Sequence, residues 1–193
     1  MNSHFFAMLA RMKYINRWAL MRNVQEESIC QHSMETAAFA HALALIKNKL
    51  FGGNLNADRV AVLALYHDMP EIITGDLPTP VKYFNEDMKE VYSKVEENAC
   101  AKLISMLPDE LKDDYSPLFF KEDEDEYLWK LVKAADKINA LTKCLEEKKA
   151  GNREFDSALV STEKAIREMN MEEADYFLDT FIRSFSLTLD EQN

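Results

Sequence analysis

The sequence predicts an all-α fold in a single domain. Apolar residues recur at helical spacing along most of the chain, and no useful length of it alternates as a half-buried strand does. Only 4 Gly and 5 Pro occur among 193 residues, so we expect long helices with short connections. This length fits one hydrophobic core, and no shift in composition marks a domain boundary, so we expect residues 1–193 to form one domain.

Two helices are predicted in the N-terminal quarter. The first is short and carries an apolar stripe of Phe5, Phe6, Leu9 and Met12. Residues 16–27 break the pattern, so we expect a loop there. Ser28 and Gln31 have the spacing of a capping box and should begin a helix that ends at Gly52-Gly53.

The next helix should run from about Asn56 to the pair His67-Asp68. Pro70 disfavours helical geometry at the preceding residue, and a loop should follow it through Gly75 and the prolines beyond. Further helices are expected over 86–106, from the acidic patch 122–126 to about 149, over 154–169 and over 172–185.

The charge of the chain limits its partners. Its 23 basic and 34 acidic side chains give a net charge of −11, which repels polyanions and argues against a broad nucleic-acid-binding face. A small phosphorylated ligand would need a local positive patch or a bound cation.

The expected location is the cytoplasm, and no membrane partner is expected. The N-terminus lacks the apolar core and cleavage site of a signal peptide, and no apolar run approaches the roughly 18 residues of a membrane span. The cysteines Cys30, Cys100 and Cys144 form no CxxC pair and are odd in number, so we expect buried thiols in a reducing compartment.

Among the histidines, His67 has the most informative neighbour. Asp68 follows it at the end of the apolar stretch 60–66, and a buried carboxylate must be paired, protonated or bound to a metal. Adjacent side chains on a helix point about 100° apart, yet they can converge on one ion near a helix end. Imidazole and carboxylate together suit first-row transition metals. His4 and His41 are expected to be structural or surface residues.

Two further residues can complete a metal site. Asp136 borders an apolar stripe, although it can equally be an exposed acid between Lys133 and Lys137. His32 lies in the first turn of its helix, where the dipole should keep the imidazole neutral and able to bind metal. Together with His67-Asp68, these residues offer two nitrogens and two oxygens and leave positions open for water and substrate.

Polar groups on two loops can bind a substrate. Glu71 and the run from Gly75 to Lys82 follow the histidine–aspartate pair, and Arg17-Trp18 lies in the first loop. Arginine recognises phosphate through its planar donor fork, and tryptophan supplies a flat wall. The alternatives are an ordinary proline-rich turn and a surface arginine beside a partly buried tryptophan.

The order His, His-Asp, Asp resembles the HD-domain metal-dependent phosphohydrolases. Several runs also resemble the bacterial 5′-deoxynucleotidases of the YfbR type, namely Ser3–Ala7, Ile15–Trp18, Tyr66–Asp68, Thr74–Phe84 and Asp175–Phe177. The run Gly75-Asp76-Leu77-Pro78-Thr79-Pro80-Val81-Lys82 is far more specific than the metal ligands alone.

The resemblance implies a single helical HD domain, with a metal-binding core over about 28–150 and C-terminal helices over about 153–185. It implies a homodimer that removes phosphate from deoxyribonucleoside 5′-monophosphates and discriminates against ribonucleotides. One divalent cation is implied, and the ligand types allow cobalt, manganese, zinc, nickel or iron.

The resemblance also implies a role for each matching residue. The metal ligands would be His32, His67, Asp68 and Asp136. Arg17 would orient the phosphate, and Trp18 would lie against the sugar, where it would crowd a 2′-hydroxyl. The catalytic residues would be Arg17, Glu71 and Asp76, and either acid can act as the general acid or base. Substrate would contact Arg17, Trp18, His32, Asp68, Asp76, Leu77, Pro78, Thr79 and Asp136.

Two other functions remain open from sequence. Another HD-domain enzyme, acting on nucleoside triphosphates, cyclic nucleotides or (p)ppGpp, would share the metal ligands but would not need the run 75–82. A non-catalytic helical binding module would hold a metal for structure alone and leave no open coordination position.

Overall fold

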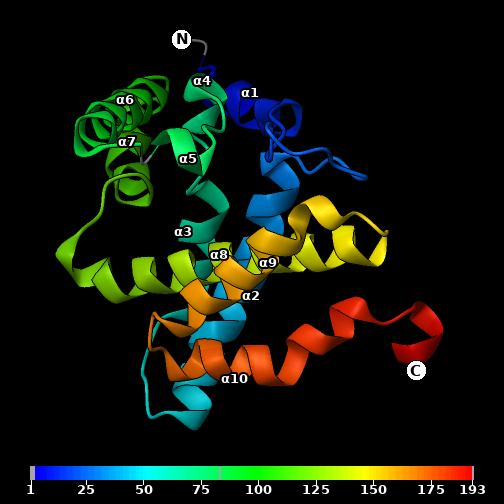
Figure 1. Cartoon of the computed structure of the whole chain (residues 1–193). Coiled ribbons are helices and arrows are strands. Elements are labelled where there is room, and N and C mark those ends of the chain that lie inside the picture. Colours follow the sequence, from blue (N-terminus) through cyan, green and yellow to red (C-terminus); the bar gives the residue numbers. More distant parts are fainter. Residues whose placement is uncertain (1–2, 83, 193) are drawn as a thin grey trace.

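The computed structural model describes residues 3–82 and 84–192, and every regular element within them is helical (Figure 1). The α-helices are α1 (Phe5–Leu9), α2 (Ile29–Leu50), α3 (Ala57–Tyr66), α4 (Glu71–Thr74), α5 (Thr79–Lys82), α6 (Glu86–Ile104), α7 (Asp109–Tyr115), α8 (Glu126–Lys149), α9 (Asp156–Arg167) and α10 (Glu172–Phe181). Short 3-10 turns are η1 (Ala10–Tyr14), η2 (Ser116–Leu118), η3 (Asp123–Asp125), η4 (Arg153–Phe155), η5 (Ile182–Ser186) and η6 (Leu189–Gln192). The all-α prediction is confirmed.

The centre of the molecule is formed by α2, α3 and α8, which pack against one another. Helix α9 lies along α8, and α10 packs on α2 (Figure 1). Their apolar faces share one core, whose fully buried members include Leu43, Leu63, Leu131 and Ile138. Because this core fixes α2, α3 and α8 relative to one another, polar side chains that these helices carry are held at fixed relative positions.

A second core lies at the end of the molecule where α1, α4 and α6 gather. Its buried members are Phe5, Met12, Ile29, Met69, Leu103 and Leu107. Met69 directly follows the predicted metal pair, so its complete burial anchors the turn that carries His67 and Asp68.

Local signals set the helix ends as predicted. Ser28 accepts a hydrogen bond from the backbone of Gln31, and the Gln31 side chain accepts one from the backbone of Ser28. This capping box begins α2 one turn before His32. Gly52, with φ of 69°, ends the helix in the left-handed region that favours glycine. Asn56 caps α3, because its side-chain oxygen accepts a hydrogen bond from the backbone N–H of Arg59.

The prediction from sequence missed short helices in segments that are rich in turn-forming residues. The expected loop after Pro70 contains α4 and α5, because proline is tolerated in the first turn of a helix, where its missing N–H is not needed. Pro70 flanks α4, and its carbonyl accepts bonds from Ile73 and Thr74. Helix α7 was also missed, since it has only 7 residues and no long apolar stripe to mark it.

Two further expectations concern membrane-spanning helices and the cysteines. None of the described helices is both long and apolar enough to cross a bilayer. The three cysteines are free, but only Cys100 and Cys144 are buried. Cys30 is exposed because it lies on the outer face of the first turn of α2, so the expectation of a buried thiol there was wrong.

Candidate metal centre

The predicted ligands come from three central helices. His32 lies in the first turn of α2, His67 is the residue that caps the C-terminus of α3, and Asp68 follows in the turn before α4. Asp136 lies midway along α8. The structure therefore brings together residues that are far apart in the sequence.

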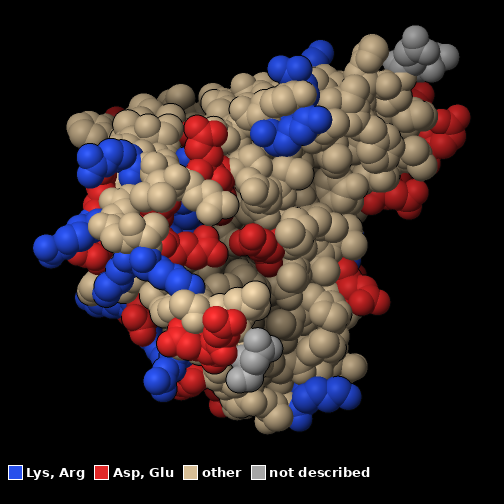
Figure 2. Space-filling model, turned by 90° about the vertical axis from the view of Figure 1, so that its right-hand side faces the viewer, with Lys and Arg blue, Asp and Glu red and all other residues tan. Residues whose placement is uncertain are grey.

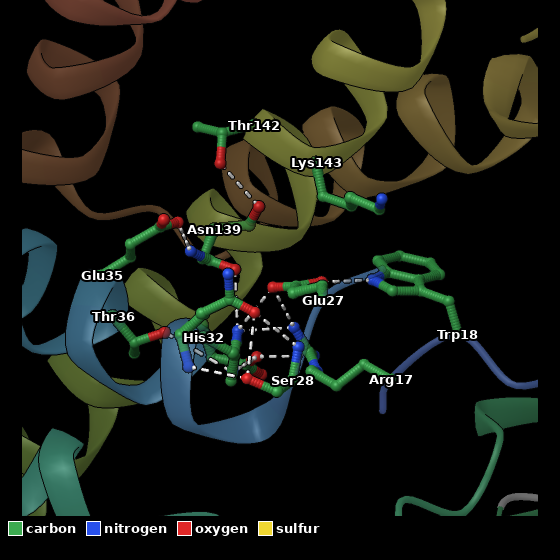
Figure 3. A network of polar contacts seen from close by, with 12 residues as sticks. Arg17, Trp18, Glu27, Ser28, His32, Glu35, Thr36, Asn139, Thr142 and Lys143 are labelled. Atoms are coloured by element: carbon green, nitrogen blue, oxygen red, sulfur yellow. Dashed lines mark hydrogen bonds and ion pairs between the residues drawn. The ribbon is translucent and has the colours of Figure 1, made fainter. Parts of the chain in front are cut away.

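His32 presents one ring nitrogen to the acids. Its Nε2 atom lies 3.3 Å from Asp68 Oδ2 and 3.2 Å from Asp136 Oδ1. The imidazole is completely buried. The opposite nitrogen, Nδ1, lies 2.7 Å from Asn139 Oδ1, which gives it an acceptor (Figure 3). Metal-binding histidines have this arrangement, in which one nitrogen donates to an oxygen and the other binds the metal.

His67 repeats the arrangement. Its Nδ1 lies 2.6 Å from the backbone oxygen of Ala64, which requires a proton on Nδ1. The Nε2 atom is buried, makes no hydrogen bond in the described structure, and lies 3.2 Å from Asp68 Oδ1. A buried nitrogen lone pair without a donor, facing a carboxylate, fits a bound cation better than it fits an empty site.

One atom each from His32, His67 and Asp68 lies within 4.8 Å of the others, a separation that one ion can bridge. Asp136 is not part of this mutually close group, although it contacts His32. Its carboxylate is about a third exposed and lies beside Arg17, so the alternative of a free surface acid between lysines is wrong.

The protonation expected for His32 needs correction. Burial and the charge of Arg17 lower its pKa, but hydrogen bonds to Asp136, Asp68 and Glu27 outweigh them and raise it well above its ordinary value. The dipole argument for a neutral ring did not include these acids. Acids that stabilise a proton on Nε2 would also stabilise a divalent cation there, so the donor set fits a metal.

Arg17 and Trp18 border the ligands, on the loop between η1 and α2. Arg17 Nη1 lies 2.5 Å from His32 Nδ1, and its Nη2 lies 3.3 Å from Asp136 Oδ1. The indole of Trp18 donates a 2.7 Å hydrogen bond to Glu27 Oε2 (Figure 3). The same ring packs edge-on against Phe155. The guanidinium therefore contacts the ligands directly, and the indole lies beside it, with the guanidinium carbon 5.8 Å from the ring centroid.

Glu71 and Asp76 also border the site. Burial and the neighbouring charges of Asp68 and Asp76 raise the pKa of Glu71 to about 9. Burial also raises the pKa of Asp76, against the opposing effect of Arg17, and Asp76 accepts a hydrogen bond from the backbone of Trp18. Both carboxyl groups can therefore hold a proton more readily than an exposed acid can.

The rest of the predicted substrate loop is less defined. Leu77 and Pro78 are partly buried between α4 and α5. The side chain of Thr79 lies outside what the structure describes, as does Tyr83. His4 is exposed and His41 is partly buried, with Nε2 of His41 3.7 Å from the exposed Asp58, and neither belongs to the close ligand group found among the described residues.

Sequence reasoning missed Glu27, Glu35 and Asn139. Glu27 contacts Arg17, Trp18 and His32, and Asn139 contacts both His32 and Glu35. Asn139 lies on the same face of α8 as Asp136, close to one helical turn beyond it, which is the only signal that could have suggested it.

Known proteins similar to this chain decide its family. A family model described as 5′-deoxynucleotidase YfbR-like matches residues 4–185. The chain belongs to this family. A 5′-deoxynucleotidase from Erwinia tasmaniensis is 52% identical over 190 residues, covering 98% of this chain and 96% of the relative. One from Vibrio vulnificus is 54% identical over 189 residues, covering 98% and 97%.

Solved structures agree with the YfbR-like assignment. An HD-domain phosphohydrolase from Listeria innocua is similar with a TM-score of 0.82 and 26% identity, covering 94% of this chain and 88% of that one. The chain is thus a YfbR-like member of the HD-domain fold, and its family consists of phosphoric monoester hydrolases. The non-catalytic alternative is set aside by this membership.

Proposed function

We propose that this chain hydrolyses deoxyribonucleoside 5′-monophosphates to deoxyribonucleoside and phosphate, and that His32, His67, Asp68 and Asp136 hold one divalent cation for this reaction. One observation carries the proposal. Two histidines on separate helices each have Nδ1 beside an oxygen and turn Nε2 toward the same carboxylate, Asp68, in a chain of this family.

The chemistry is a displacement at phosphorus. Water adds to phosphorus, the bond to the 5′-oxygen breaks, and a proton reaches that oxygen. When bound, the cation supplies Lewis acidity toward the phosphate and toward water. Arg17 has its guanidinium beside the ligands and stabilises charge that develops on the phosphoryl oxygens. Glu71 and Asp76 move the protons, one from water and one to the leaving oxygen.

Selectivity for the deoxyribose is assigned to Trp18. The indole is held against Phe155 and by Glu27, so its plane cannot turn away without breaking both contacts. A rigid wall against the sugar would crowd a 2′-hydroxyl and leave a 2′-hydrogen undisturbed. Leu77, Pro78 and Thr79 complete the proposed substrate site.

The test is phosphate release from dAMP and AMP with Co²⁺, Mn²⁺ and other divalent cations, using dATP to detect pyrophosphate release. We expect release from dAMP, little from AMP, and none from dAMP in Asp68→Ala. Asp58→Ala, an exposed acid on the helix that His67 caps, is the matched control and should behave as the unchanged chain. Full activity of Asp68→Ala would reject the proposal, and equal rates for dAMP and AMP would reject the role of Trp18.

Further properties belong to the same proposal. We expect the metal to be Co, Mn, Zn, Ni or Fe, the chain to form a homodimer from a single domain, and the cell compartment to be the cytoplasm. A nucleic-acid polymer is not an expected partner, and acidic and basic side chains are interspersed on the face drawn in Figure 2. Light scattering of the purified chain tests the dimer.

A further inference from the structure

We infer that Asn139, fixed in orientation by Glu35, is a positioning residue that sets the tautomer of His32 for metal binding. This inference rests on the proposed metal centre and adds two residues to it. Neither residue belongs to the proposed ligand set or to the proposed substrate contacts.

The first step is the contact with His32. Asn139 Oδ1 lies 2.7 Å from His32 Nδ1, and both side chains are buried (Figure 3). A carbonyl oxygen only accepts, so this contact is a hydrogen bond when Nδ1 carries the proton. When the ring loses its second proton to bind a metal, Nε2 is left with its lone pair, and that atom faces Asp68 and Asp136.

The second step is the orientation of the amide. An asparagine can be turned so that its NH₂ group, rather than its oxygen, faces a partner. Here Asn139 Nδ2 donates a 2.7 Å hydrogen bond to Glu35 Oε2. Turning the amide would place its oxygen against a carboxylate that cannot donate a proton. Glu35 therefore holds the oxygen toward His32.

The third step concerns Arg17, whose Nη1 lies 2.5 Å from the same Nδ1 atom. Arginine only donates, so this contact and the one from Asn139 cannot both be hydrogen bonds to a single tautomer of His32. Because Glu35 fixes the orientation of the Asn139 amide, we infer that Nδ1 of His32 donates to Asn139 and does not accept a hydrogen bond from Arg17. Among the described residues, the hydrogen-bonding partners then left to the guanidinium lie at 3.3 Å (Asp136) and 3.4 Å (Glu27), so it is available to a phosphate.

The sequence positions fit this arrangement. His32 and Glu35 lie one turn apart on α2, and Asn139 lies on the facing helix α8. The chain of contacts therefore crosses between two helices that pack directly on each other, which keeps its distances fixed. Glu35 reaches the surface, where its charge remains solvated.

The experiment measures Co²⁺ affinity by calorimetric titration of the metal-free protein. In Asn139→Leu, which removes the acceptor, we expect the dissociation constant to rise about 10- to 100-fold. Thr142→Val is the matched control, because Thr142 is likewise buried on α8, and within the described part of the chain its hydroxyl bonds only the backbone oxygen of Asn139. It should bind Co²⁺ as the unchanged chain does.

A second variant guards against a folding defect in Asn139→Leu. The double change Asn139→Asp with Glu35→Gln keeps the net charge and provides a carboxylate acceptor for His32. The amide introduced at position 35 can donate to that carboxylate and hold it in place. We expect the double variant to restore Co²⁺ affinity to within a few-fold of the unchanged chain. Failure of this rescue in a protein with unaltered thermal stability would overturn the inference.

Nuclear magnetic resonance supplies a readout that packing alone would not change. In the Zn²⁺-loaded protein, long-range proton–nitrogen spectra should show metal on Nε2 of His32 and an exchange-protected proton on Nδ1, and that protection should be lost in Asn139→Leu. Metal bound to Nδ1 of His32 would overturn the inference about Asn139 but not the proposed metal centre. So would a Co²⁺ affinity in Asn139→Leu equal to that of the unchanged chain. No Co²⁺ binding by the unchanged chain would overturn the proposed metal centre as well.

Discussion

At the scale of single residues, Trp18 shows how the site depends on its surroundings. Its backbone has φ of 62°, in the left-handed region that residues with a side chain rarely adopt. Such a conformation persists only where neighbours hold it. Glu27 bonds the indole, Asp76 bonds the backbone, and Phe155 packs against the ring. Three other residues therefore hold Trp18 and its indole in this orientation.

This dependence gives a prediction for Glu27. Replacing it with Leu removes the acceptor of the indole N–H, so Trp18 should turn more freely against the sugar. A hydrogen bond to a charged group contributes about 1.5–3 kcal/mol, so selectivity should fall at least about tenfold. The measurement is the ratio of kcat/KM for dAMP to that for AMP.

The control for that measurement is Glu26→Gln. Glu26 is the neighbouring acid, exposed, and bonded only to the side chain of Asn16 among the described residues. Its ratio should match that of the unchanged chain. An unaltered ratio in Glu27→Leu would show that Trp18 is held without Glu27.

At the scale of elements, the loop 15–28 is tied to α8 by one buried carboxylate. Glu147 accepts hydrogen bonds from the backbone of Val24 at 2.9 Å and of Gln25 at 3.2 Å, and from Asn152 at 2.8 Å. It also pairs with Lys143, which donates to the backbone oxygen of Gln25. The loop that carries Arg17 and Trp18 therefore owes its position to α8.

Glu147 gives a prediction about stability. Its side chain is about 1% exposed, so Glu147→Leu would leave Lys143 charged, buried and unpaired. Loss of one partner from a buried pair costs about 3–5 kcal/mol, so the free energy of unfolding should fall by that order. Urea denaturation measures it. Glu163→Gln, an exposed acid on α9, should change the value little. A loss below about 1 kcal/mol in Glu147→Leu would contradict the anchoring role.

The pKa of Glu147 also predicts how the stability of the protein depends on pH. Burial would raise the pKa of Glu147, but hydrogen bonds from Lys143, Asn152 and the loop backbone lower it from 4.5 to about 2. A pKa depressed on folding means that the unfolded chain takes up the proton first. The stabilisation is therefore complete above pH 4.5 and lost as the pH falls from 4.5 toward about 2. Glu147→Leu should unfold with a flatter pH dependence across that window.

At the scale of the whole molecule, the candidate ligands connect α2, the end of α3 and α8. A cation bound to all of them would favour the folded state, because the unfolded chain does not hold them together. At a free metal concentration of about 100 times Kd, the stabilisation is about 2.7 kcal/mol. For a chain of this size that corresponds to a rise in Tm of about 5–11 °C.

Calorimetry with and without a chelator tests this coupling. Removal of the metal should lower Tm by that amount, and the difference should vanish in Asp68→Ala. The same Tm in both conditions would mean that the cation does not link the helices.

The sequence by itself determined the helical class, most helix ends and the identity of the candidate ligands. Helical periodicity, the capping box at Ser28 and the glycines near residue 52 are local signals, since their causes lie within a turn of the residue concerned. The pair His67-Asp68 was found in the same way, and family resemblance joined it to His32 and Asp136.

Only the tertiary structure decided how those residues interact. The protonation of His32 depends on Asp68 and Asp136, which reach it from other helices, so an argument from its own helix dipole gave the wrong direction. Glu27 and Glu35 carry no local signal of their own, and Asn139 has only its place about one turn beyond Asp136 on α8. Their importance comes from partners distant in sequence. Hydrogen bonds and charges act through space over a few ångströms, and only the packing of α2 against α8 brings these groups within that range.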